Sequence, residues 1–234
     1  MPVKNQNNKL EEGISLYKKN KYVDALTSFL ALTNNDDIDE VELSYYLGLC
    51  NSKLGRYEEA LTYLEQVVTD DADNLDSQQK SRLSQCRYLL AVIYVKTGRN
   101  SLADYELNKI LETDYKKASV YASLAYITWQ KGDVDSCIEL YEKALEIDEN
   151  NPTALNGLGY VLSDSHRDLT RALSLCKKAV SIAPESSACL DSLGWSYYNL
   201  GRRSDCLKYL NKALEKDRDN EIILEHIKQA GVEE

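Results

Sequence analysis

Small and apolar residues recur along the chain at a nearly constant interval, and these columns predict paired helices. The spacing is 34 or 35 residues, with one exception of 43. Within each interval the apolar positions follow helical spacing, and Gly55, Gly98, Gly132 and Gly201 separate two amphipathic segments. The first column of small residues consists of Gly13, Gly48, Ala91, Ala125, Gly159 and Gly194, and the second of Ala25, Ala60, Ala103, Cys137, Ala172 and Cys206. Close contacts between backbones are expected where these small residues lie.

The long interval contains about nine extra residues, from Leu75 to about Leu83. Several of them, such as Gln78, Gln79 and Lys80, are good helix formers, and Asn74 or Asp76 could cap a helix. We therefore expect residues 75–83 to extend the following helix at its start and not to form a loose loop.

Composition narrows the classes of fold and ligand. Three prolines and ten glycines among 234 residues leave little room for turn-rich β structure. The net charge of −10 argues against nucleic acid as a partner, because a nucleic-acid site needs a basic face. Residues 1–80 hold 8 basic and 15 acidic side chains, which indicates either an acidic solvated surface or a region that attracts basic partners.

Targeting signals and cysteine chemistry are not indicated. Residues 1–8 show no apolar signal-peptide core, and the longest apolar run, 88–95, is far shorter than the roughly 20 residues of a membrane span. We expect a cytoplasmic protein without membrane insertion. The six cysteines form no Cys-x-x-Cys pair, and with only two histidines present we expect small buried side chains and no metal site or cofactor.

The columns resemble the tetratricopeptide repeat, in which Leu-Gly, Tyr, Ala, an aromatic residue, Ala and Pro recur along a helix hairpin. Leu158-Gly159, Ala172, Ala179 and Pro184 match this pattern, as do Leu193-Gly194, Tyr197 and Ala213. The resemblance covers about residues 6–220 and implies an all-α, right-handed superhelical solenoid of antiparallel hairpins. The implied repeats are 6–39, 41–74, 84–117, 118–151, 152–186 and 187–220 in a single domain, with a capping helix and tail at 221–234.

In this family the first helices of the repeats line a concave groove, which implies a set of partner-binding residues here. The set is Tyr45, Tyr46, Tyr88, Tyr126, Trp129, Gln130, Asn156, Tyr160, Trp195, Tyr198 and Asn199, with Asp164 and Asp191 on the same face. The Leu, Ala and Cys columns already fill the core, so these aromatic residues are expected on the open face, although packing between repeats is the alternative. The two-carboxylate clamp of chaperone-binding relatives is missing, because Leu10, Tyr46 and Gln85 stand at matching positions.

Enzyme motifs do not stand out. Gly157 and Gly159 begin like a dinucleotide-binding loop but lie inside a predicted helix, and Leu162 replaces the third glycine. No catalytic residue is therefore expected. We expect a non-enzymatic scaffold or adaptor that binds a peptide or helix of another protein in the aromatic groove. The alternatives are a self-assembling structural subunit with weak homo-oligomerisation, or a regulatory or chaperone subunit of a secretion or motility apparatus.

Overall fold

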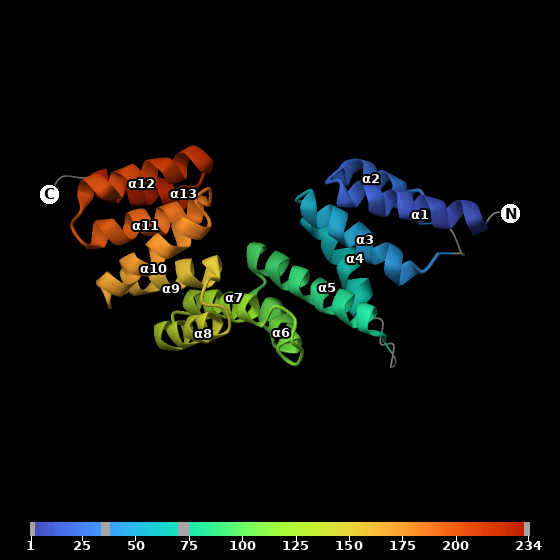
Figure 1. Ribbon diagram of the computed structural model, residues 1–234, viewed down its shortest axis with the longest axis horizontal. Coiled ribbons are helices and arrows are strands. Elements are labelled where there is room, and N and C mark those ends of the chain that lie inside the picture. The colour runs from blue at the N-terminus through green and yellow to red at the C-terminus, as the bar shows by residue number, and fades with distance from the viewer. Residues whose placement is uncertain (1–2, 34–37, 70–74, 232–234) are drawn as a thin grey trace. The chain divides into compact units, whose positions relative to one another are not determined.

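The computed structural model describes residues 3–33, 38–69 and 75–231, and in this part of the chain it contains helices and no strand (Figure 1). The helices fall into two compact units, residues 1–115 (unit 1) and 116–234 (unit 2). Unit 1 holds α1 (Val3–Lys18), α2 (Tyr22–Leu30), α3 (Glu40–Lys53), α4 (Tyr57–Thr69), α5 (Ser77–Lys96) and α6 (Asn100–Leu111). Unit 2 holds α7 (Lys117–Gln130), α8 (Val134–Ile147), α9 (Pro152–Asp164), α10 (Leu169–Ile182), α11 (Ser187–Asn199), α12 (Arg203–Lys216) and α13 (Glu221–Gly231).

Consecutive helices pair as hairpins, and within each unit neighbouring hairpins stack on one another. In unit 1, α1 packs on α2, α3 on α4 and α5 on α6, while α2 contacts α3 and α4 contacts α5. In unit 2, α7, α9 and α11 pack on α8, α10 and α12, and the first helices α7, α9 and α11 also contact one another in turn. The predicted all-α architecture of stacked hairpins is thus confirmed.

The turn inside each hairpin needs a left-handed residue. Glycine supplies it at Gly55, Gly98, Gly132 and Gly201, where φ lies between 70° and 82°. The residue after each glycine donates its N–H to a carbonyl five residues earlier, as Arg202 does to Tyr197 at 2.9 Å, which closes the first helix of the hairpin. Asn20 and His166 take the left-handed conformation in the two hairpins without a turn glycine.

The first column of small residues marks the places where paired helices approach most closely. A Cβ added at Gly159 would lie 2.5 Å from Cys176 Sγ and 3.1 Å from the carbonyl oxygen of Ala172. A Cβ at Gly48 would lie 2.6 Å from the side chain of Leu64. Larger residues are excluded by contact at these positions, which explains the periodic Gly and Ala in the sequence.

Helix α5 begins well before the first small residue of its hairpin, Ala91. The carboxylate of Asp76 accepts a hydrogen bond from the backbone N–H of Gln79, and Oε1 of Gln79 accepts one from the backbone N–H of Asp76, so a capping box starts the helix at Ser77. Residues 77–83 are therefore helical. The alternative cap, Asn74, lies outside the described residues, as do residues 232–234 of the expected tail. The repeat boundaries listed above and the single-domain assignment stay predictions.

Helix α13 packs on α12 and α11 at the end of unit 2. Ile223, His226 and Ala230 are buried in these contacts, whereas Ile222 and Leu224 are exposed. No helix in the described part of the chain is long and apolar enough to cross a membrane.

Candidate functional site

In unit 2 the predicted site residues of α7 and α9 lie close together. Tyr126 is 44% exposed, and its hydroxyl accepts a hydrogen bond from Nε2 of Gln130 at 2.9 Å. Trp129 meets Tyr160 edge to face, with ring centroids 6.2 Å apart and an interplanar angle of 90°. This geometry is favoured between aromatic rings, and both rings remain half-buried. The structure thus brings aromatic residues of two successive first helices into contact.

Polar side chains connect α9 to α11. Nε1 of Trp195 donates a hydrogen bond to Oδ1 of Asp164 at 3.1 Å. The amide of Asn199 donates to the hydroxyl of Ser163 at 3.0 Å and to its carbonyl oxygen at 3.3 Å. These contacts fix the orientation of Trp195 and Asn199, so the face formed by α7, α9 and α11 presents a pre-organised set of rings and amides.

At the end of the unit, α13 covers part of this face. His226 stacks on Trp195 with centroids 4.2 Å apart, and Trp195 in turn stacks on Tyr198 at 4.8 Å. Nδ1 of His226 lies 2.8 Å from Oδ1 of Asp191, and both side chains are buried. The expectation that Trp195 lies open to solvent is therefore wrong, because α13 buries it to 7% exposure.

His226 was not identified as part of this face from the sequence. His226 lies 34 positions after Ser192, a buried residue of α11. If the repeat interval is continued past the last complete hairpin, His226 takes the position in the next first helix that Ser192 has in α11, and it is then expected to pack against α11. That signal is weak, because the short final helix does not contain the recurring small residues by which the full repeats are aligned.

Asn156 lies on the same helix as Tyr160, one turn earlier, and its Oδ1 is a buried acceptor without a hydrogen-bond partner. An unsatisfied buried acceptor costs free energy, and because this atom is closed to solvent, a donor from another molecule does not reach it in this structure. Burial, together with the carboxylates of Asp164 and Asp191, raises the pKa of Tyr160 to about 12, so its hydroxyl stays neutral near pH 7.

The predicted site residues of unit 1 are packed differently. Tyr45 is 8% exposed, its hydroxyl donates to Oε1 of Gln85 at 2.9 Å, and the guanidinium of Arg82 lies 5.3 Å from its ring centroid. Tyr46 stacks on Phe29 at 5.3 Å. The expectation of an exposed Tyr45 is wrong, because the start of α5 lies over it. Tyr88 is half-buried and meets Tyr115 edge to face at 6.4 Å.

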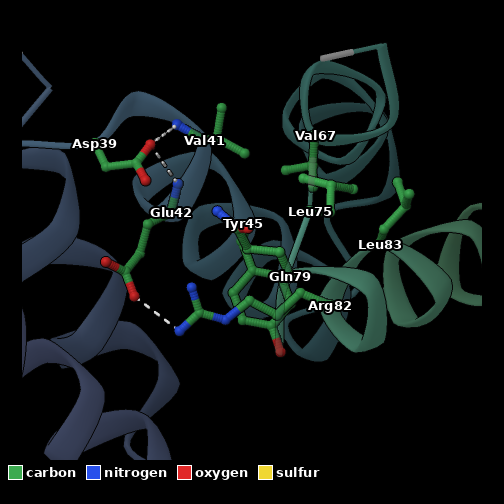
Figure 2. Close-up of a pocket in the computed structure, with 9 residues that line it drawn as sticks. All are labelled: Asp39, Val41, Glu42, Tyr45, Val67, Leu75, Gln79, Arg82 and Leu83. Carbon is green, nitrogen blue, oxygen red and sulfur yellow. Dashed lines mark hydrogen bonds and ion pairs between the residues drawn. The ribbon is translucent and has the colours of Figure 1, made fainter. Parts of the chain in front are cut away.

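A small pocket opens beside Tyr45 between α3, the end of α4 and the start of α5 (Figure 2). Its volume is about 100 Å³, and its lining residues are Asp39, Val41, Glu42, Tyr45, Val67, Leu75, Gln79, Arg82 and Leu83. In Figure 2 Arg82 extends past the ring of Tyr45 toward Glu42, with which it forms an ion pair at 2.8 Å. The pocket is a consequence of the extended α5, which supplies Gln79, Arg82 and Leu83.

The six cysteines are free thiols and all are buried. Burial raises the pKa of Cys50 and Cys206 to about 11, and that of Cys86, Cys137 and Cys176 to about 12. These thiols behave as small apolar core residues. Among the described residues, no group of three or more His, Cys, Asp or Glu side chains is placed to hold a metal ion.

Comparisons with known proteins agree with the helix pattern. Family models described as tetratricopeptide repeat match residues 10–75 and 187–220, and one described as TPR repeat matches residues 125–164. A TPR repeat-containing protein of Pseudomonas aeruginosa is 39% identical over 161 residues, which cover 66% of this chain and 27% of that protein. In four of the curated relatives that it matches, the chain spans only 21% to 27% of the length of that protein.

Two solved structures have the same fold. A tetratricopeptide repeat protein from Parabacteroides merdae superimposes with a TM-score of 0.71 at 14% identity, covering 97% of this chain and 85% of its own. YrrB, described as a TPR protein with an unusual peptide-binding site, gives a TM-score of 0.51 at 18% identity, covering 86% of this chain and 97% of its own. With its recurring columns, stacked hairpins and three matching stretches, the chain belongs to the tetratricopeptide repeat family.

Proposed function

We propose that this protein is a non-enzymatic interaction module that binds a segment of another protein along one face of unit 2. We call this surface the inner face and define it by Tyr126, Trp129, Gln130, Asn156, Tyr160, Tyr198 and Asn199. The observation that carries the proposal is the connected row of rings and amides on α7, α9 and α11, which runs from the exposed Tyr126 to the stack of Trp195 and Tyr198. Core packing alone does not require such a row.

The chemistry of the inner face suits a peptide. Tyr and Trp provide a large contact area at a low cost in side-chain entropy, and such residues dominate binding energy at many interfaces. The exposed amide of Gln130 can pair with backbone N–H and C=O groups of a peptide. An extended or helical segment with one or two apolar side chains would satisfy both kinds of contact.

Membership of the repeat family supports this reading in general terms, because proteins of this fold commonly mediate protein–protein interactions. The description of YrrB names a peptide-binding site in that protein. At 18% identity the likeness concerns the fold, so the inner-face residues themselves carry the proposal here.

A fluorescence experiment tests the proposal directly. The chain contains two tryptophans, and Trp195→Phe leaves Trp129 as the single reporter while keeping a ring against His226. Peptides selected from a random display library on this variant should shift the emission of Trp129. Tyr126→Ala should weaken their binding about 30-fold, as expected for loss of an interface hot spot.

The matched control is Ile147→Ala, which removes a side chain of similar exposure from α8. It should leave peptide affinity unchanged. If no selected peptide changes Trp129 emission, or if the Ile147 and Tyr126 variants bind equally well, the inner face is not the binding surface. Sedimentation at several protein concentrations distinguishes peptide binding from self-assembly.

A further inference from the structure

The pocket beside Tyr45 lies in unit 1 and is not part of the inner face, so it raises a separate question. It exists because α5 starts at Ser77, about three turns before Tyr88 and about four turns before Ala91. Val41, Val67, Leu75 and Leu83 give it apolar walls, and in Figure 2 Val67 and Leu75 lie next to each other at one side. In α7, α9 and α11 the helix begins only after the positions that correspond to Gln79 and Arg82, so these helices do not supply such side chains.

The size of the pocket limits its occupant. The pocket volume of about 100 Å³ equals the volume that roughly three molecules occupy in liquid water. A branched aliphatic side chain of four carbons has a similar volume. A side chain such as leucine or isoleucine would exchange water for contact with the apolar walls, which is favourable. An indole ring or a folded domain would not enter.

The charge around the opening limits the occupant further. Asp39 and Glu42 line the pocket, and Glu40 lines a wider neighbouring hollow of about 420 Å³ that shares Val41 with it. The one guanidinium at this site, on Arg82, is already paired with Glu42. The N-terminus of α3 contributes about half a positive charge, so two carboxylates beyond the Arg82 pair leave the opening negative.

We infer that this pocket is an anchor site for an aliphatic side chain that stands next to a lysine or arginine in a partner protein. The aliphatic group enters between Val67 and Leu83, and the neighbouring cation lies near Asp39 and Glu40. The inference goes beyond the inner face of unit 2 and does not depend on it. It also gives the acidic character of residues 1–80 a specific use.

Three small probes of the same shape test this chemistry. Isopentylamine carries a cation, isopentanol is neutral and isovalerate is an anion. Titrated into the full-length ¹⁵N-labelled protein, the amine should shift the backbone amide signals of Glu42, Gln79 and Leu83, with a dissociation constant of about 10 mM, as expected for so small a ligand. The alcohol should bind about 3-fold more weakly and the anion more weakly still. Added salt should reduce the difference.

Two variants separate the charge from the cavity. Asp39→Asn keeps the cap of α3, because Asn caps helices about as well as Asp, and should weaken the amine about 3-fold without affecting the alcohol. Leu83→Phe should fill the pocket and abolish binding of both probes, whereas Leu102→Phe, at an exposed position of α6, should change neither.

The inference is overturned if no probe shifts these amides, if the anion binds as well as the amine, or if Asp39→Asn has no effect. Tyr126→Ala serves as the control for independence. It removes a ring from the inner face and should leave the amine titration unchanged, so failure of either proposal is recognised without reference to the other.

Discussion

The two units differ in where their aromatic residues lie relative to the first column of small residues. The rings compared here come one helical turn earlier in unit 1 than in unit 2. In unit 1 the rings precede the small residue by three positions, as Tyr45 precedes Gly48 and Tyr88 precedes Ala91. In unit 2 Tyr160 follows Gly159 directly and Trp195 follows Gly194 directly, while Trp129 and Tyr198 lie one turn further on. That shift decides the neighbours of each ring.

The consequence is visible in the contacts. Tyr45 of unit 1 lies under Arg82 and Gln85 of α5 and helps to wall a small pocket. Tyr160 of unit 2 instead meets Trp129 of α7 and belongs to a continuous row of rings. Residue type alone therefore does not define a binding face, because the position relative to the small column determines what a ring touches.

The largest effect expected in a comparison of unit 1 with unit 2 is on the rate at which their buried thiols react. Burial raises the pKa of Cys86 in unit 1 and of Cys176 in unit 2 to about 12, from an ordinary thiol value of 9.0. At pH 8 the thiolate population of each should be about 1000-fold lower than in the unfolded chain. Reaction with a chromogenic disulfide, followed with and without denaturant, measures this ratio.

The sign of the associated pH effect follows from the same shifts. The folded protein holds these protons more tightly than the unfolded chain, so the contribution of these two thiols to stability is constant below about pH 9 and is lost as pH rises toward 12. Fast labelling of the cysteines of one unit alone in native buffer would show that this unit opens readily, and the two units would then differ in stability as well as in surface.

The next largest effect is expected at the close helix contacts. Gly159→Ala should lower the free energy of unfolding of unit 2 by about 3 kcal/mol, because the added Cβ meets the Ala172 carbonyl and Cys176. Gly48→Ala in unit 1 should cost about 1 to 2 kcal/mol, since the clashing atoms belong to the side chain of Leu64, which can adjust.

Hydrogen exchange resolved by residue distinguishes the two units in both variants. Gly231→Ala is the control, because a Cβ at Gly231 meets no atom within 4 Å. Equal costs at Gly48 and Gly159 would contradict the view that a Cβ at Gly159 is opposed by backbone, whereas one at Gly48 is opposed mainly by a side chain that can adjust.

A smaller effect is expected where α13 meets α11. His226→Ala removes the stack on Trp195 and leaves the buried carboxylate of Asp191 without this partner, which should cost about 2 kcal/mol. The double variant with Asp191→Ala should be less destabilised than the sum of the two single variants. Urea unfolding monitored by tryptophan emission measures all three, and additive costs would show that the two residues do not interact.

The sequence allowed the repeating part of this structure to be predicted, because that part depends on local periodicity. Gly159, Ala172 and Ala179 could be assigned to hairpin contacts from their spacing alone. The packing of Trp195 could not, since it depends on His226, a residue in a final helix that has no complete set of columns. The contact between Arg82 and Glu42 joins positions 40 residues apart across an irregular interval, so the regular spacing gave no guide to it.

The early start of α5 has a consequence for how this surface can change. Residues 77–83 add about 10 Å of helix beyond the regular hairpin. Insertions or deletions before Arg82 would lengthen or shorten this extra part of the helix, so its capped end would lie further from or closer to the hairpin. The contacts of Leu90 and Ala91 would not be disturbed. A family of variants could therefore widen, narrow or close the space beside Tyr45 in steps of single residues, while the remainder of the hairpin stack stays the same.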